Sequence, residues 1–283
     1  MACLHPDQDP RRLLDYRRLQ PAFGHGREGL PRVVDINTWF NQANTYPAPP
    51  WAFRGSNQIA INFDADAEAI AALLPPGVTM DLEPDGSARC EIRICWYPWS
   101  VYGPFHECYV LVRTRHKDET VWFLPLIMTD NDIPTSCGRE VWGYAKKLAT
   151  MSWEWGAHTG GQVVFTMERP AGVRLLTATF APHRRALPTE RVGHHVMSHR
   201  HITGGNGNTT SELILVGGSK ALHVSANGEL DMWAGQGSIN VPGASIDDPW
   251  HFVKPTRINN AYWMITDFAL EPGRVVDDLT LVR

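Results

Sequence analysis

Several features that would place this chain of 283 residues in a special class are missing from its sequence. No apolar run approaches the roughly 18 residues that a membrane-spanning helix needs, and the first residues contain no apolar segment of a secretory signal. Lysines and arginines are scattered, and the formal net charge is −4, which argues against a surface for nucleic acid. We therefore expect a cytoplasmic protein with no membrane partner and no nucleic-acid partner.

Cysteines are few, and they form no recognisable set. They are odd in number and lack the paired spacing of a metal site: Cys3, Cys90, Cys95, Cys108 and Cys137. We expect reduced thiols. The hydrophobic share of 43 % is enough for a substantial core, so the chain should be globular.

Helical periodicity is also scarce. The clearest case is a short helix capped by Asp64 or Asp66, because the apolar residues Ile70, Leu73 and Leu74 follow at helical spacing. Short β-branched or aromatic runs, separated by Gly, Pro, Asn and Asp, predict many strands. These runs are 58–63, 87–96, 107–114, 121–128, 162–167, 173–180, 213–216, 221–225 and 261–270. Together they favour a mostly antiparallel β-barrel or sandwich.

Residues 1–45 differ from the rest in mixing prolines with charged pairs, and they include one possible short helix at 13–19. We interpret them as an N-terminal extension that wraps a neighbouring subunit, covers a pocket edge or is simply a flexible tail. Residues 46–283 contain no repeat and no linker, so we predict one domain there. We expect a homo-oligomer.

The run 87–96 alternates strictly between two kinds of residue. Cys90, Ile92 and Ile94 fall on one face of an extended strand, whereas Glu91 and Arg93 fall on the other. This pattern predicts a half-buried strand, with Glu91 either exposed and paired to arginine or lining the interior of a barrel.

Two adjacent lysines, Lys146 and Lys147, stand among bulky apolar residues such as Trp142 and Tyr144. On a solvated face such a pair would be unremarkable. If the segment is buried, desolvation and repulsion between the two ammonium groups both lower their pKa and produce a nucleophilic amine that can attack a carbonyl.

The run Gly-Arg-Glu-x-x-x-Tyr-x-Lys-Lys-Leu at 138–148 resembles the signature of the acetoacetate decarboxylase family. The resemblance implies a mostly β (α+β) fold, an antiparallel closed cone-like β-barrel with a few short helices and the lysine inside. It also implies that Lys146 forms a Schiff base, that Lys147 lowers the pKa of Lys146, and that no metal or organic cofactor is needed. Tyr144, within the same motif, is our candidate for contact with substrate.

The family also has two glutamates upstream of the lysines. The frame Arg-x-Glu-Ile matches Glu91, and the nearest match for the second is Glu107, which requires one inserted residue in the preceding loop. His106 occupies the unshifted position. We prefer Glu107 because only a carboxylate fits the role that the resemblance implies.

Two departures from the family stand out. The arginine that its decarboxylases carry at the start of the first strand, expected to bind the substrate carboxylate, aligns with Ser56 or Asn57. Arg54 lies on the same face of an extended strand as Ser56, so it is our candidate substitute. Ala145 replaces a proline that is common in the family.

A rival constellation is the set of histidines at 194, 195, 199 and 201. The His-x₃-His spacing suits zinc if the segment is helical. However, the metalloprotease glutamate is missing, and glycines bracket the segment, which favours a loop. Loop histidines and a pocket role for one of them are the other two interpretations.

The resulting hypothesis is a Schiff-base lyase that decarboxylates a 3-oxo acid, with a small keto acid as its partner. Lys146 would supply the electron sink, and Glu91 and Glu107 would position the substrate and move protons. The first alternative is an aldolase or dehydratase that uses the same lysine on pyruvate or another 2-oxo acid. The second is a non-catalytic barrel that binds a hydrophobic ligand.

Overall fold

The computed structural model describes residues 46–47, 49–190, 193–205, 207–224 and 227–280. All of them belong to the second of the chain's two units, Asn44–Arg283. The helix expected at 13–19 lies outside the described residues, so the interpretation of residues 1–45 as an extension stays a prediction.

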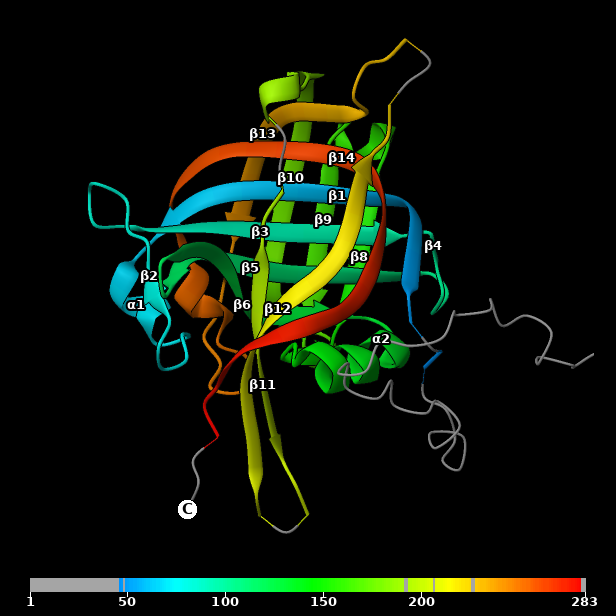
Figure 1. The fold of residues 1–283 in the computed structure, drawn as a ribbon. Helices are drawn as coiled ribbons and strands as arrows, with labels where there is room; N and C mark the ends of the chain where they lie inside the picture. Colours follow the sequence, from blue (N-terminus) through cyan, green and yellow to red (C-terminus); the bar gives the residue numbers. More distant parts are fainter. Residues whose placement is uncertain (1–45, 48, 191–192, 206, 225–226, 281–283) are drawn as a thin grey trace, which may run out of the picture. The chain divides into compact units, whose positions relative to one another are not determined.

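The main sheet closes on itself into a barrel (Figure 1). Neighbouring strands of the ring are antiparallel except β6 and β11, and the ring closes because β14 pairs with β1 as well as with β12. In order around the ring the strands are β1 (Trp51–Ala65), β3 (Ala88–Tyr97), β5 (Phe105–His116), β6 (Glu119–Thr129), β11 (Val196–Thr203), β12 (Thr209–Leu222) and β14 (Pro255–Asp278). The predicted mostly β fold is confirmed.

A second stretch of the same sheet continues from β14 and packs against the ring. Its strands are β13 (Met232–Asn240), β10 (Arg174–Arg185), β9 (Val163–Glu168) and β8 (Thr150–Trp155). Three short strands, β2 (Thr79–Met80), β4 (Trp99–Ser100) and β7 (Lys146–Leu148), pair with β5, β1 and β6. The helical segments are α1 (Ala67–Ala71), α2 (Asp132–Cys137), the π-helical turn η4 (Gly138–Trp142), and the 3₁₀ turns η5 (Ala157–Thr159), η6 (Pro188–Glu190) and η7 (Trp250–Val253).

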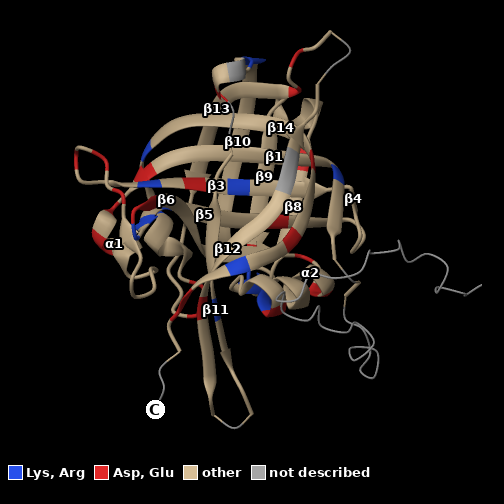
Figure 2. Cartoon of the chain, in the orientation of Figure 1, with Lys and Arg blue, Asp and Glu red and all other residues tan. Residues whose placement is uncertain are grey.

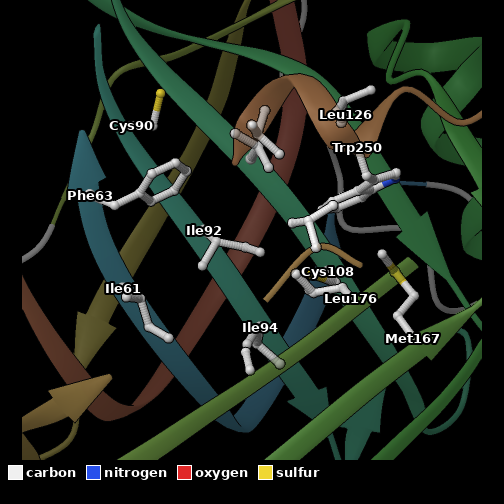
Figure 3. Close-up of a cluster of buried hydrophobic side chains, with 14 of the residues drawn as sticks. Ile61, Phe63, Cys90, Ile92, Ile94, Cys108, Leu126, Met167, Leu176 and Trp250 are labelled. Atoms are coloured by element: carbon white, nitrogen blue, oxygen red, sulfur yellow. The ribbon is translucent and has the colours of Figure 1, made fainter. Parts of the chain in front are cut away.

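The largest hydrophobic core lies between the ring and this second stretch (Figure 3). Ile61, Ile92 and Ile94 from the ring meet Met167 of β9 and Leu176 of β10 there. Strand alternation sends the intervening residues of β1, β3 and β5 to the opposite face, which is the inside of the ring. The apolar half of the alternating pattern therefore builds the core, and the other half builds an interior cavity.

This arrangement corrects the prediction of a half-buried strand at 87–96. Glu91 and Arg93 are 0 % and 3 % exposed, although they lie on the polar face. The ring closes over that face, so both sides of β3 are covered. Many of the other charged residues lie near strand ends and in the connecting segments (Figure 2).

Other elements follow the sequence pattern to different degrees. Helix α1 has Asp66 as its N-cap, with the carboxylate accepting a hydrogen bond from the backbone N–H of Ala69. The runs 213–216 and 221–225 were predicted as two strands, but β12 is one strand that continues to Leu222. The loop predicted around His199 and His201 is wrong, since both residues lie on β11. Helix α2 and the η4 turn were not predicted.

Within the part of the chain that the structure describes, the helices are all too short or too polar to cross a membrane.

Candidate active site

Lys146 is carried into the ring by β7, the short strand that follows the η4 turn. Parallel pairing with β6 sets Lys146 opposite Ile127. The turn into this strand needs Gly143, whose φ of 72° is left-handed and whose place leaves no room for a Cβ beside the backbone of Arg200. As a result the Lys146 side chain is only 7 % exposed.

The ammonium group of Lys146 contacts one carboxylate and two aromatic rings. Its Nζ lies 2.5 Å from Oε2 of Glu107, and the ring centroids of Tyr144 and Phe105 are 5.7 and 5.9 Å away. The hydroxyl of Tyr97 donates to the other oxygen of Glu107 at 3.3 Å. Burial raises the pKa of Tyr97 well above its usual range, so this hydroxyl keeps its proton.

Gly138 makes room for the lysine. A Cβ at this position would lie 2.7 Å from Cδ and 2.8 Å from Cε of Lys146, which is closer than real Cβ atoms approach. The lysine stem therefore rests directly on the backbone of the η4 turn. Only glycine allows this close approach.

The cavity around Lys146 has a volume of about 200 Å³. That is smaller than the roughly 300–1,000 Å³ of sites for drug-sized ligands, so it suits a small organic molecule. Most of its wall is aromatic or aliphatic, and its polar side chains come from β1, β3, β5, β7 and the segment before β11. The polar side chains in the lining, tyrosines aside, are Gln58, Arg93, Glu107, Lys146 and His194.

Glu91 lies behind this wall rather than in it. Its Oε1 accepts a hydrogen bond of 2.8 Å from Nε of Arg93, and its Oε2 lies 2.9 Å from Nε2 of His194. Burial acts to raise the pKa of Glu91, but the charge of Arg93 and the hydrogen bond from His194 outweigh it and lower that pKa to about 2. Glu91 is therefore ionised at neutral pH, which makes it a counter-ion and a poor proton donor.

Lys147 points the other way. Its Nζ lies 2.9 Å from Oδ1 of Asp248 and also donates to the backbone carbonyl of Asp247. Arg169 contacts the second oxygen of Asp248 at 3.3 Å. Lys147 does not line the cavity, so the structure does not bring the two amines together as the predicted lowering of the Lys146 pKa by Lys147 requires.

The arginine predicted to bind substrate is also outside the cavity. Arg54 is exposed, and its Nη1 donates to the neighbouring carbonyl of Phe53. A β-bulge between Phe53 and Ser56 breaks the simple alternation on which the prediction depended. Arg54 therefore does not line the cavity, as its predicted role requires, and Arg93 is the arginine in the cavity lining.

The side chains of Glu107 and His106 point to different places. His106 lies 2.8 Å from Asp130 and stacks on Trp96, and it does not line the cavity. Glu107 faces inward and reaches Lys146.

The four histidines do not form one centre. His199 and His201 lie on one face of β11 with ring centroids 5.6 Å apart, whereas His194 stacks on Trp122 and lines the cavity. No group of three or more His, Cys, Asp or Glu among the described residues could hold a metal ion.

Sequence reasoning missed Gln58 and Arg93 as cavity residues, and it gave one of the four histidines a pocket role without identifying His194 as that one. The signal for Arg93 was present, because it shares a strand face with Glu91, and that face could line a barrel interior. Gln58 carried no comparable signal, because its position depends on strand pairing. The sequence singled out the four histidines as a group, but only the loop before β11 places His194 at the cavity.

Known proteins resemble this chain in sequence and in fold. The model of the family described as acetoacetate decarboxylase (ADC) matches residues 40–279. Acetoacetate decarboxylase 3 of Mesorhizobium japonicum is 27 % identical over 106 residues, which are 37 % of this chain and 40 % of the relative. The matched region thus spans well under half of that relative's length.

Two solved structures share the fold across most of the chain. The acetoacetate decarboxylase of Legionella pneumophila superposes with a TM-score of 0.73 at 24 % identity, covering 90 % of this chain and 99 % of the other. The enduracididine biosynthesis enzyme MppR, in complex with the condensation product of pyruvate and imidazole 4-carboxaldehyde, gives 0.68 at 15 % identity, covering 85 % and 94 %. At these identities the similarity concerns the fold.

Proposed function

Because the chain belongs to the acetoacetate decarboxylase family, we propose that it is a carbon–carbon lyase that decarboxylates a 3-oxo acid through an imine on Lys146. The observation that carries this proposal is the position of the Lys146 amine. It is enclosed in a small cavity with a mostly aromatic and aliphatic wall, and it lies 2.5 Å from a carboxylate.

In the proposed reaction, the neutral amine of Lys146 attacks the ketone carbon, and the resulting carbinolamine loses water to give a protonated imine. The bond to the carboxylate then breaks, and its electron pair moves into the imine to form an enamine while carbon dioxide leaves. Protonation of the enamine carbon restores the imine, and water releases the ketone product and the free lysine. These steps require no metal or organic cofactor.

Glu107 is the proposed proton carrier, because it contacts the reacting nitrogen directly. Tyr97 holds the second carboxylate oxygen, and Tyr144 supplies an apolar wall for the substrate. We assign Glu91 to positioning, since its ionised carboxylate contacts Arg93 and His194 behind the cavity wall.

An aldolase or dehydratase acting on a 2-oxo acid is the second candidate function. It is favoured by the similarity to MppR, whose structures include complexes with pyruvate and with a pyruvate condensation product. With such a substrate the same imine would lose an α-proton and add to an aldehyde, and no carbon dioxide would form. A barrel that binds a ligand without turnover is the third outcome to test.

The decisive experiment combines borohydride trapping with gas analysis. The protein is incubated with acetoacetate or pyruvate, reduced, and analysed by mass spectrometry, while carbon dioxide is measured in parallel. We expect a reduced adduct on the peptide that contains Lys146, no adduct in Lys146→Ala, and carbon dioxide from acetoacetate.

The other outcomes separate the three functions. Trapping of both acids without carbon dioxide would favour the aldolase or dehydratase. Equal trapping in wild type and Lys146→Ala would end the Schiff-base proposal, and absence of trapping would leave the ligand-binding barrel.

A further inference from the structure

Arg93 is a second cationic group in the cavity lining, besides Lys146, and the steps described above give it no role. Its side chain is almost fully buried and comes from the middle of β3. Burying a guanidinium group is costly unless its hydrogen bonds are made, so each of its N–H groups needs a partner.

The described contacts use three of the five N–H groups of Arg93. Nε and Nη2 both donate to Oε1 of Glu91, and Nη1 donates to Oε1 of Gln58 at 2.9 Å. One N–H on each Nη atom is left over by these contacts within the described part of the chain. Two neighbouring N–H groups are the number that a carboxylate accepts in a bidentate pair.

The surroundings hold Arg93 in a fixed position. Glu91 is itself held by His194, which stacks on Trp122 at a centroid distance of 4.0 Å. Gln58 is fixed at its other end by a hydrogen bond of 3.1 Å to Thr266. A guanidinium that is held from both sides loses little freedom when an anion binds to it.

Strand register places this group close to the lysine. Glu107, the partner of Lys146, pairs with Cys95 of β3. Arg93 lies two residues before Cys95 on the same strand and pairs with Tyr109. Two residues of strand span roughly 7 Å. Because Arg93 and Lys146 both have long side chains and line the same cavity, a molecule of a few carbons can contact both groups.

We propose that Arg93, oriented by Glu91 and Gln58, binds the carboxylate of the substrate, and that the enzyme therefore selects short keto acids over neutral ketones. The inference rests on the proposed function, because it concerns the carboxylate of a substrate whose ketone reacts with Lys146. Glu91 and Gln58 are positioning residues in this scheme.

The ion pair with Glu91 also fits a carboxylate that must leave. A lone buried cation would bind the acid tightly and oppose its conversion to neutral carbon dioxide, whereas Glu91 offsets most of the charge of Arg93. What remains is a directional pair of N–H donors. They position the acid without a strong net attraction to its charge.

The test uses two keto acids and one neutral diketone on the full chain. Acetoacetate, pyruvate and 2,4-pentanedione are titrated against wild type, Arg93→Gln and Arg93→Lys, and the modified fraction is measured by mass spectrometry after borohydride for the acids and directly for the diketone. Arg54→Gln is the matched control, because it removes an arginine from the same sheet but outside the cavity.

We expect Arg93→Gln to raise the half-saturating concentration of both acids by about tenfold to a hundredfold, which is the effect of losing a charge-assisted hydrogen bond. Labelling by the diketone should stay close to wild type in both Arg93 variants, and Arg54→Gln should behave as wild type with all three probes. Arg93→Lys keeps a positive charge but has no fork of donors, so it should lose most of the preference for acids.

Arg93→Gln leaves the charge of Glu91 buried without its cation, which destabilises the fold. A double variant, Glu91→Gln with Arg93→Gln, removes both charges and avoids this effect. Loss of acid binding with intact diketone labelling in the double variant supports the proposal. An equal loss for acids and diketone in both backgrounds, or no change for the acids, would overturn it. If wild type reacts with none of the three probes, the proposed function fails first, and the role of Arg93 fails with it.

Discussion

Lys146 and Lys147 are neighbours in sequence, yet their surroundings are those of two different parts of a protein. Lys146 is 7 % exposed, beside Glu107 and two aromatic rings, whereas the Lys147 side chain is 36 % exposed and paired with Asp248 near the surface. Consecutive residues of a strand point to opposite faces, so the three-residue strand β7 is enough to separate them. Adjacency in the chain is therefore a poor guide to which charges interact.

The two buried glutamates make the same point. Glu107 and Glu91 both face the inside of the ring, but Glu107 contacts the amine of Lys146 and Glu91 contacts the guanidinium of Arg93. The partner of each carboxylate decides whether it can exchange a proton or only hold a charge. We therefore expect the two lysines, and the two glutamates, to differ in what their replacement does.

The largest effect among these tests is expected for Glu107→Gln, which keeps the shape of the side chain but removes its proton-transfer capacity. Turnover of a reactive keto acid should fall by about 10² or more, the range of a general acid–base group. The measurement is the steady-state rate, with the thermal midpoint as a check that the fold persists.

His106→Gln is the matched control, because His106 precedes Glu107 in the chain and lies outside the cavity. It should leave the rate unchanged. A comparable fall in His106→Gln, or an unchanged rate in Glu107→Gln, would refute the assignment of Glu107.

Gly138→Ala tests how closely the surroundings of Lys146 are fitted to it. The backbone at Gly138 is right-handed helical, so alanine is acceptable there in itself, but its Cβ would collide with Cδ and Cε of Lys146. A displaced amine should react on the order of 10 to 10² times more slowly, because near-attack geometry is lost. Trapping rates with acetoacetate measure this effect.

Gly243→Ala serves as the comparison, since a Cβ there would meet nothing within 4 Å. It should react like wild type. Wild-type reactivity in Gly138→Ala would mean that the lysine can adopt a second position with no loss.

The sequence predictions succeeded where an element has local causes, and they failed where it depends on long-range pairing or packing. Alternating and β-branched runs predicted most strands of the ring, because the hydrophobic pattern and the strand propensity agree there. Strand β11 was missed because it is polar and bracketed by glycines, and it forms through pairing with β12 and β6. The η4 turn likewise depends on packing around Trp142, which is buried. The indole N–H of Trp142 donates a hydrogen bond to the backbone carbonyl of Glu271.

At the site, the motif located Lys146, and the match to the family's upstream glutamates located Glu107, but neither gave the direction of Lys147 or the role of the Glu91 face. Those depend on how the ring closes, which one strand's pattern cannot specify. The expectation that Arg54 shares the face of Ser56 failed because a bulge beside Ser56 interrupts the alternation along β1. The family resemblance identified the pair of Lys146 and Glu107, and the residues around this pair required the closed structure.

The smallest predicted effect distinguishes between two roles of Lys147, an electrostatic effect on Lys146 and the anchoring of β7. If its charge promotes the neutral form of Lys146, Lys147→Ala should slow trapping, whereas Asp248→Asn should speed it up by leaving the Lys147 cation uncompensated. If Lys147 instead anchors β7, both variants break the same ion pair and should slow trapping alike. The geometry favours the anchor, since Nζ of Lys147 lies 2.9 Å from Asp248.

We expect a decrease of at most about fivefold in both variants, because a partly exposed ion pair contributes roughly 1 kcal/mol or less. Arg169→Gln controls for the other partner of Asp248, since it removes the 3.3 Å contact and leaves Lys147 in place. Trapping rates across several pH values provide the measurement, and the sign of the Asp248→Asn effect is decisive. A faster reaction in Asp248→Asn together with a slower one in Lys147→Ala would restore the electrostatic role of Lys147, acting across the strand from the opposite face.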